Sequence, residues 1–117
     1  MGNLDSAIVT KSPLVGSYSY TDAGGEQTFL EILTGLPCVL CGGWIDASVM
    51  TKDGSIKIYN KVDGTNYRLI TTLSVTALTP GTFLNMVMGC NSAIKFTWTE
   101  VADEAAARTI YYSFVRI

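Results

Sequence analysis

Ten carboxylate side chains give this chain its widest chemical possibilities. Two carboxylates that face one cleft, roughly 5 to 9.5 Å apart, can perform the acid–base chemistry of glycoside hydrolysis. Glu31 and Asp46 fall within expected strands, so a small hydrolase needs these two to share a cleft. Most of the other acids fall at expected turns, where a solvated carboxylate needs no catalytic role: Asp22, Glu26, Asp53, Asp63, Asp103 and Glu104. We therefore predict that the protein is not an enzyme and has no catalytic residue.

The chain contains no histidine, which removes several common catalytic and metal-binding systems. Ser–His–Asp and Cys–His nucleophiles and HExxH zinc sites all need an imidazole. Cys38 and Cys41 form a CxxC motif and Cys90 follows far downstream, but a structural zinc site needs four Cys or His ligands. A redox CxxC belongs to a βαβ setting, of which the sequence shows no sign. We expect buried, reduced thiols and no metal or cofactor.

The segment Asp63-Gly64-Thr65-Asn66 combines a carboxylate with neutral oxygen ligands. Calcium takes about six to eight oxygens, so this segment alone offers too few, and a hairpin turn explains it fully. No phosphate-binding glycine loop is present. The sequence therefore predicts no ion or phosphate site here.

Six tyrosines and two tryptophans are enough aromatic residues for a sugar-stacking platform. Tyrosine and tryptophan also belong to strand interiors and to subunit interfaces. Both interpretations stay open for the five tyrosines that could supply such a platform, which are Tyr18, Tyr20, Tyr59, Tyr111 and Tyr112.

Charge and hydropathy exclude two further classes of partner. The formal net charge is −2, and the eight Lys and Arg residues are spread singly along the chain, so no basic patch for nucleic acid emerges. The uncharged stretch over residues 32–45 is interrupted by Gly35, Pro37, Gly42 and Gly43. We therefore expect neither a nucleic-acid partner nor a membrane-spanning helix.

Turn signals recur every 8 to 12 residues, and β-branched and aromatic residues fill the intervals, as is typical of all-β sandwiches and barrels. We predict an all-β, eight-stranded antiparallel β-sandwich, with residues 1–13 as an N-terminal arm and residues 14–117 as a single domain. The expected strands lie near 14–20, 27–33, 38–50, 55–62, 66–76, 82–89, 93–100 and 109–116.

Alternation of apolar and polar residues indicates which side of each strand faces the core. The expected inward sets are Ile56, Ile58 and Val62; Ile94, Phe96 and Trp98; and Tyr67, Leu69, Leu73 and Val75. The segment 100–108 is the one helix-like patch, with Glu104 and Arg108 four residues apart, but nine residues are marginal for an isolated helix. We expect a loop there, with at most one helical turn.

The expected strands 82–89 and 109–116 are apolar on both sides, whereas a sandwich strand needs only one apolar face. The surplus residues are covered either by a loop of the same chain or by a neighbouring subunit. The second interpretation makes the following residues a candidate subunit interface: Leu84, Met86, Met88, Tyr111 and Val115.

A jelly roll and a simpler meander make different predictions for two turns. In a jelly roll the fourth and fifth strands pair in one sheet, so Asp63-Gly64 is a tight hairpin. The third and fourth strands lie in opposite sheets, so Asp53-Gly54 is a corner. Eight short strands in one small domain favour the jelly roll.

Three stretches of the chain carry a resemblance. Residues 54–68 (GSIKIYNKVDGTNYR) resemble a phrase found in small uncharacterised proteins of tailed phages and environmental viral genomes. Residues 16–28 (GSYSYTDAGGEQT) and 99–114 (TEVADEAAARTIYYSF) are similar to the opening and the end of the same proteins. The resemblance extends over most of the chain from about residue 14. It implies a jelly-roll-like virion component of the decoration or head-fibre type that assembles as trimers.

The resemblance defines no catalytic residue, and the CxxC and the first dozen residues depart from it. The expected function is therefore that of a non-enzymatic structural virion protein, a capsid decoration or accessory subunit. Its expected partners are copies of itself and other virion proteins, its expected location is the virion, and assembly is expected in the host cytoplasm. The alternative is a carbohydrate-binding module of a tail or adhesin protein.

Overall fold

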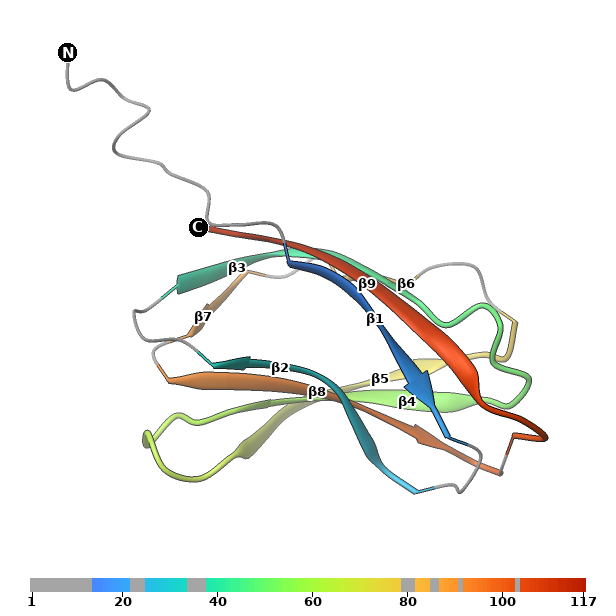
Figure 1. Cartoon of the computed structure of the whole chain (residues 1–117). Coiled ribbons are helices and arrows are strands. Elements are labelled where there is room, and N and C mark those ends of the chain that lie inside the picture. The colour runs from blue at the N-terminus through green and yellow to red at the C-terminus, as the bar shows by residue number, and fades with distance from the viewer. Residues whose placement is uncertain are drawn as a thin grey trace, which may run out of the picture.

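The computed structural model describes residues 14–21, 25–33, 38–78, 82–84, 87–90, 92–102 and 104–117. The predicted arm 1–13 lies outside the described residues. Within the described part of the chain every regular element is a strand, and the strands form the two layers of a sandwich, as Figure 1 shows. The all-β prediction is confirmed.

The first layer, sheet A, has the strand order β1-β9-β3-β6, and β7 also pairs with β3. All of these pairings are antiparallel. The strands of sheet A are β1 (Leu14–Tyr20), β3 (Cys38–Asp46), β6 (Thr82–Leu84), β7 (Met88–Cys90) and β9 (Arg108–Arg116).

The second layer, sheet B, has the order β2-β8-β4-β5 and is also antiparallel. Its strands are β2 (Gln27–Leu33), β4 (Gly54–Asn60), β5 (Arg68–Val75) and β8 (Ala93–Glu100). When β6 and β7 are counted as one interrupted strand, the two sheets have the orders 1-8-3-6 and 2-7-4-5. This is the eight-stranded arrangement of a jelly roll.

The core lies between the sheets and is built by the alternation seen in the sequence. Ile56 and Ile58 from β4 are buried, and so are Ile94, Phe96 and Trp98 from β8. Sheet A contributes the buried side chains of Tyr20, Leu40, Ile45, Ile110 and Phe114. The rings of Phe96 and Phe114 meet across the layers with centroids 5.1 Å apart, a separation favourable for a tilted aromatic pair.

The connections decide between the jelly roll and the meander. The segment 47–53, which includes Asp53, leads from β3 in sheet A to β4 in sheet B, so it is a corner. Two of its residues, Ala47 and Met50, are buried and are joined by a backbone hydrogen bond of 3.0 Å. β4 and β5 pair directly as a hairpin. Both topological predictions are confirmed.

The β4–β5 hairpin is wider than a two-residue turn. Residues 61–67 connect the strands, Gly64 has a φ of 78°, and Asp63 Oδ1 accepts the backbone N–H groups of Thr65 and Asn66. The prediction that Val62 faces the core is wrong: Val62 is 73 % exposed because the loop begins before it. Hydrogen bonds to the Asp63 side chain, rather than a two-residue turn, shape the backbone of this loop.

The predicted strand 82–89 is two short strands, β6 and β7, which pair with different parts of β3. β3 itself has a register shift between Leu40 and Gly43, and Gly42 has a φ of 102°. Leu69, predicted to face inward, is 52 % exposed on β5, the edge strand of sheet B. The segment 100–108 contains no helix among its described residues.

Candidate functional site

The outer face of sheet B carries a network of polar groups that bind one another. Tyr59 and Thr97 donate short hydrogen bonds to the carboxylate of Glu26. Tyr67 donates to Glu31 at 2.6 Å. The ammonium group of Lys95 lies 4.9 Å from the ring centroid of Tyr59 and 4.6 Å from that of Tyr67, within cation–π range. These contacts join three strands.

Electrostatics agree with a closed network on this face. Partial burial would raise the pKa of Glu26, but the hydrogen bonds from Thr97 and Tyr59 and the charges of Lys57 and Lys95 hold that pKa below its ordinary value. The same hydrogen bond to Glu26 raises the pKa of the Tyr59 hydroxyl. Since the tyrosine rings are already in contact with Lys95, this face offers no open stacking platform.

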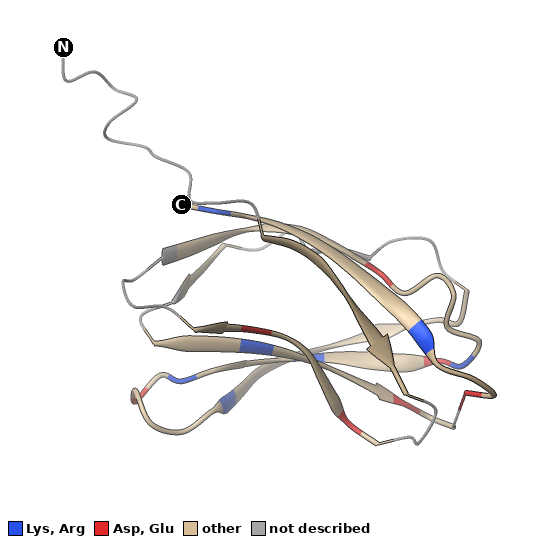
Figure 2. Ribbon diagram, viewed as in Figure 1, with Lys and Arg blue, Asp and Glu red and all other residues tan. Residues whose placement is uncertain are grey.

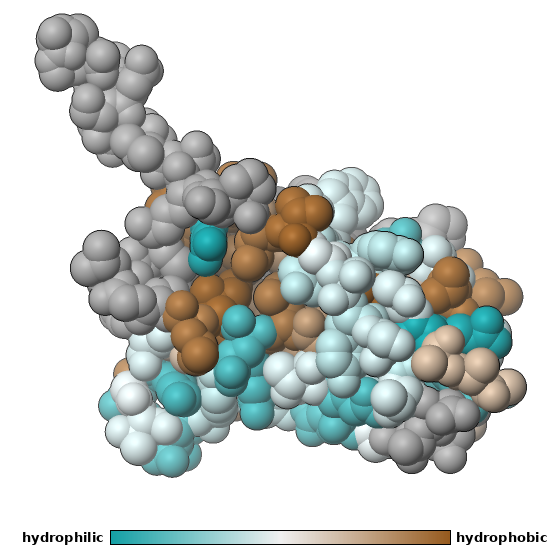
Figure 3. Space-filling view, in the orientation of Figure 1, coloured by the Kyte–Doolittle hydropathy of each residue, from teal (hydrophilic) through white to brown (hydrophobic). Residues whose placement is uncertain are grey.

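The outer face of sheet A is apolar and exposed. Four large side chains from three strands point outward: Val15 is 67 % exposed, Trp44 53 %, Tyr111 55 % and Val115 54 %. We call this set the outer apolar face. In the space-filling view of Figure 3, apolar side chains gather beside the start of β1. A charge-poor apolar surface is typical of the centre of a protein interface.

Charges are almost absent from the middle of sheet A. Within the described strands of that sheet the charged residues are Asp46, Arg108 and Arg116, each at a strand end. Sheet B carries charges within its strands, at Glu31, Lys57 and Lys95, and Figure 2 shows this contrast. The two outer faces therefore have opposite chemical character.

The outer apolar face contains a hollow of about 210 Å³. Register explains it: Val15 and Trp44 both lie opposite Ser113, whose small side chain separates the larger ones. Tyr111 and Asp46 pair in the neighbouring row. The volume suits one or two apolar side chains or part of a sugar ring. The hollow is lined by Val15, Gly16, Trp44, Asp46, Tyr111, Tyr112 and Ser113.

The structure divides the predicted interface residues. Tyr111 and Val115 belong to the outer apolar face. Met88 is partly buried and packs against the core. Leu84 is placed by its backbone alone, opposite Gly43, and Met86 lies outside the described residues. Met88 therefore does not share the outer face of Tyr111 and Val115.

The aromatic candidates also separate. Tyr20 is fully buried and donates to the Gly25 carbonyl oxygen at 3.0 Å, and Tyr18 and Tyr112 pack against the core. Of the tyrosines proposed for a platform, Tyr111 is the one on the outer apolar face. Sequence analysis missed Trp44, although its place two residues before Asp46 in a strand signalled a shared face.

Glu31 and Asp46 do not share a cleft. Glu31 lies on β2 in sheet B and bonds Tyr67, whereas Asp46 ends β3 in sheet A and accepts the Ser48 N–H at 2.9 Å. The hypothesis of a hydrolase built on this pair is therefore wrong.

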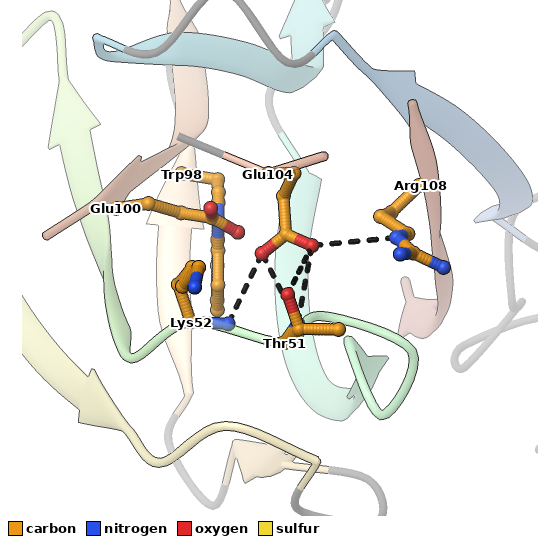
Figure 4. Close-up of polar contacts among 6 residues, drawn as sticks. All are labelled: Thr51, Lys52, Trp98, Glu100, Glu104 and Arg108. Carbon is orange, nitrogen blue, oxygen red and sulfur yellow. Dashed lines mark hydrogen bonds and ion pairs between the residues drawn. The ribbon is translucent and has the colours of Figure 1, made fainter. Parts of the chain in front are cut away.

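Glu104 corrects the prediction that the acids of the turns are solvated. Its side chain is buried and accepts hydrogen bonds from the Thr51 N–H, the Thr51 hydroxyl and the Lys52 N–H. Arg108 Nε lies 3.3 Å from Glu104 Oε1, so the predicted Glu104–Arg108 pair is present without a helix. Figure 4 shows these contacts around the carboxylate. Asp22 and Asp103 lie outside the described residues.

Glu100 lies beside Glu104 (Figure 4) and accepts the Trp98 indole N–H at 2.9 Å. Burial and the neighbouring Glu104 carboxylate raise the pKa of Glu100 to about 7. The pKa of Glu104 is lowered: burial opposes this, and the hydrogen bonds from Thr51 and with Glu100 outweigh it. Two carboxyl groups with separated pKa values can act as acid and base. However, the buried Glu104 carboxylate is occupied by backbone contacts, so this pair is structural.

The cysteine prediction is partly wrong. Cys41 is exposed and reduced, not buried. Cys38 and Cys90 are backbone partners on β3 and β7. Among the described residues no group of three or more His, Cys, Asp or Glu is arranged to hold a metal ion. No helix in the described part is long and apolar enough to cross a membrane.

Comparisons with known proteins give structural neighbours alone. No family model and no curated protein matches the chain. The fold is similar to the structure of infectious bursal disease virus, Gx strain (17 % identity, TM-score 0.44), and to the VP2 subviral particle of that virus (15 %, 0.45). Each match covers 92 % of this chain and 32 % of the viral chain.

A third neighbour is the Drosophila NLP core, a structure described for pentamer formation and histone binding. It is 11 % identical with a TM-score of 0.45, and the match covers 92 % of this chain and 99 % of that one. Our chain thus spans about a third of the length of the viral chains and nearly the whole length of the NLP core.

Proposed function

We propose that this protein is a non-enzymatic structural subunit of a virion, of the capsid decoration or accessory type. It acts by binding copies of itself, as a trimer, and other virion proteins. The outer apolar face of sheet A is the surface through which it binds. The observation that carries the proposal is the exposure of Val15, Trp44, Tyr111 and Val115 on one charge-poor sheet face.

The contrast between the sheets supports an orientation in the assembly. An apolar face that stays in water is unfavourable by about 25 cal/mol for each Å² that a partner could cover. The outer face of sheet B gains nothing comparable, because Glu26, Glu31 and Lys95 are already bound within it. Sheet A therefore faces the partner, and sheet B faces solvent. The virion assignment is supported by the sequence resemblance over residues 54–68.

Light scattering behind a sizing column tests this proposal with two matched variants. Val115→Asp places a charge on the outer apolar face, and Val62→Asp places the same charge on the exposed β4–β5 loop. We expect the unmodified protein and Val62→Asp to elute as the same oligomer. We expect Val115→Asp to elute as a monomer with an unchanged thermal unfolding curve, because an unpaired charge within an apolar interface opposes association.

An unmodified protein that stays monomeric at about 100 µM, a concentration about a hundred times a micromolar Kd, contradicts the proposal. A folded Val115→Asp variant that keeps the native mass does so too. In that case the oligomer uses another surface.

A carbohydrate-binding module is the second candidate, because Trp44 and Tyr111 lie beside Asp46 at the hollow. Exposed aromatic rings with a nearby carboxylate are suited to stacking and hydrogen bonding with a pyranose. Trp98 is fully buried, so a change of tryptophan fluorescence on adding oligosaccharides would come from Trp44. A response that Trp44→Phe abolishes supports this candidate, and no response across a broad glycan panel excludes it.

A further inference from the structure

A buried carboxylate joins two connections at one end of the sandwich. Glu104, in the connection between β8 and β9, accepts the Thr51 N–H at 3.1 Å, the Lys52 N–H at 3.1 Å and the Thr51 hydroxyl at 2.8 Å. Thr51 and Lys52 belong to the corner that joins the two sheets. The carboxylate thus ties this corner to the β8–β9 connection, 52 residues away in sequence.

Glu100 lies beside Glu104, and one of its two carboxylate oxygens is left without a partner among the described residues. Its Oε1 accepts the Trp98 indole N–H, but its buried Oε2 has no hydrogen-bond partner in the described part of the chain. Both Glu100 and Glu104 accept when ionised, so two charged carboxylates placed side by side repel. A proton on Glu100 turns Oε2 into a donor to Glu104 and satisfies both groups.

We propose that Glu100 and Glu104 share one proton and form a pH-controlled latch that holds the corner 47–53 against the β8–β9 connection. With the proton present the latch is closed. When the proton leaves to solvent, two adjacent carboxylates remain, and the Glu104 contacts to the corner weaken. The latch is independent of the outer apolar face and does not rest on the proposed function.

The charged groups around the pair come from two elements. Lys52 on the corner favours the ionised form of Glu100, and Arg108 on β9 favours that of Glu104. Asp53, also on the corner, lines a hollow of about 360 Å³ together with Glu100. Burial and the charge of Glu104 outweigh Lys52, and so the pKa of Glu100 lies at about 7. The proton therefore leaves near neutral pH.

The latch controls more than one connection. The Met50 carbonyl oxygen of the corner accepts the N–H of Leu78, a residue with a φ of 60°. A leucine in the left-handed region persists where surrounding contacts hold it. The carbonyl oxygen of Asp53 accepts the N–H of Val101. Opening the latch is therefore expected to loosen three connections at this end while leaving the sheets paired.

Trp98 provides a local reporter for the test. Its indole N–H donates to Glu100, and the other tryptophan, Trp44, lies on sheet A. We would record ¹H–¹⁵N NMR spectra of the full chain between pH 5.5 and 8.5 and assign the indole signals with Trp44→Phe. We expect the Trp98 indole signal to shift with a midpoint near pH 7. The amide signals of Thr51 and Lys52 are expected to shift with the same midpoint.

Few other groups can imitate this result. The chain has no histidine, the side chain whose ordinary pKa lies within this range. In Glu100→Gln the amide keeps a donor for Glu104, so we expect a folded protein whose Trp98 and Thr51 signals no longer titrate. Glu31→Gln, on the other sheet face, is the control and is expected to titrate like the unmodified protein.

Two outcomes of the NMR titration overturn the latch. One is a Trp98 indole signal that stays constant from pH 5.5 to 8.5. The other is a titration near pH 7 that persists in Glu100→Gln. Hydrogen exchange gives an independent reading: the Thr51 and Lys52 amides are expected to exchange faster above pH 7, after correction for intrinsic rates, than in Glu100→Gln. Equal corrected rates also contradict the proposal.

Discussion

Glu104 is the residue whose removal we expect to destabilise the fold most among the acids. Its carboxylate satisfies two backbone N–H groups and a hydroxyl and lies beside Arg108. Losing one partner of a buried charged network removes about 3 kcal/mol or more, because the remaining groups stay unpaired. We expect Glu104→Ala to lower the free energy of unfolding in urea by about this amount. Glu31→Ala, on an exposed carboxylate, is expected to change it by less than about 1 kcal/mol.

The dependence of stability on pH follows from the same pair. Glu100 has its pKa raised from 4.5 to about 7, so its contribution is full below pH 4.5 and is lost as the pH rises through 7. Glu104 has its pKa lowered, so its contribution is present above pH 4.5 and is lost as the pH falls. We expect the urea unfolding free energy to be greatest between these limits.

In Glu100→Gln the decline above pH 7 is expected to disappear, while the decline in acid remains. A native protein with the same stability at pH 6 and pH 8.5 would show that the carboxyl pair does not control this end of the fold.

The importance of Glu104 could not be predicted from the sequence. Glu104 and Arg108 are four residues apart, and this spacing indicated an ion pair correctly. The main contacts of Glu104, however, are to Thr51 and Lys52, and a contact across 52 or 53 residues exists only once the corner and the connection meet. A carboxylate among alanines in a short loop looks the same whether it is solvated or buried.

Gly43 shows how closely β3 and β9 approach. A Cβ atom at this position would lie 2.2 Å from the Ser113 carbonyl oxygen and 2.8 Å from Phe114 Cα. Backbone atoms cannot yield as a side chain can, so the two central strands of sheet A would have to separate. We expect Gly43→Ala to lower the unfolding free energy by roughly 3 kcal/mol.

Gly89 on β7 is the matched control, because it pairs with β3 as well and an added Cβ meets nothing within 4 Å. Gly89→Ala is expected to stay within about 0.5 kcal/mol of the native protein. Equal losses at both glycines, measured by urea unfolding, would contradict the close approach at Gly43.

At the scale of elements the sequence predicted most of the sheet. Strict alternation located β8, whose Ile94, Phe96 and Trp98 are all buried. The same rule failed for Val62, because β4 ends at Asn60 and Val62 already lies in the exposed loop. It failed again over 82–89, where both faces are apolar and the pattern gives no position for the break between β6 and β7. Alternation predicts strands well and their ends poorly.

The whole molecule is a sandwich whose two outer faces differ. We call the outer face of sheet B closed, because its polar groups bind one another, and the outer face of sheet A open, because large apolar side chains are exposed on it. The two faces differ because Glu26 and Glu31 bind tyrosines on sheet B, whereas sheet A has its charges at strand ends. Tyr111 and Val115 were predicted for the open face, and Trp44 joins them only because β3 pairs with β9. The surface is complete only when β3 pairs with β9, and the local sequence pattern does not specify which strands pair.

The size of the open face sets the expected strength of association. Four strands about 4.8 Å apart and about seven residues long at 3.4 Å per residue give a projected footprint of roughly 450 Å². A stable interface usually buries about 800 Å² per partner. The face alone is therefore expected to support association that dilution reverses.

The most direct test of the account is the accessibility of Trp44 across that dilution. Acrylamide quenching of tryptophan fluorescence would be measured from about 100 µM to about 0.1 µM, spanning a micromolar Kd, with the mass followed by light scattering. Trp98 is buried in every state and supplies a constant background. We predict that Trp44 is shielded in the oligomer and becomes accessible as the mass falls to that of one chain. An oligomer in which Trp44 is quenched as readily as in the monomer would contradict the account.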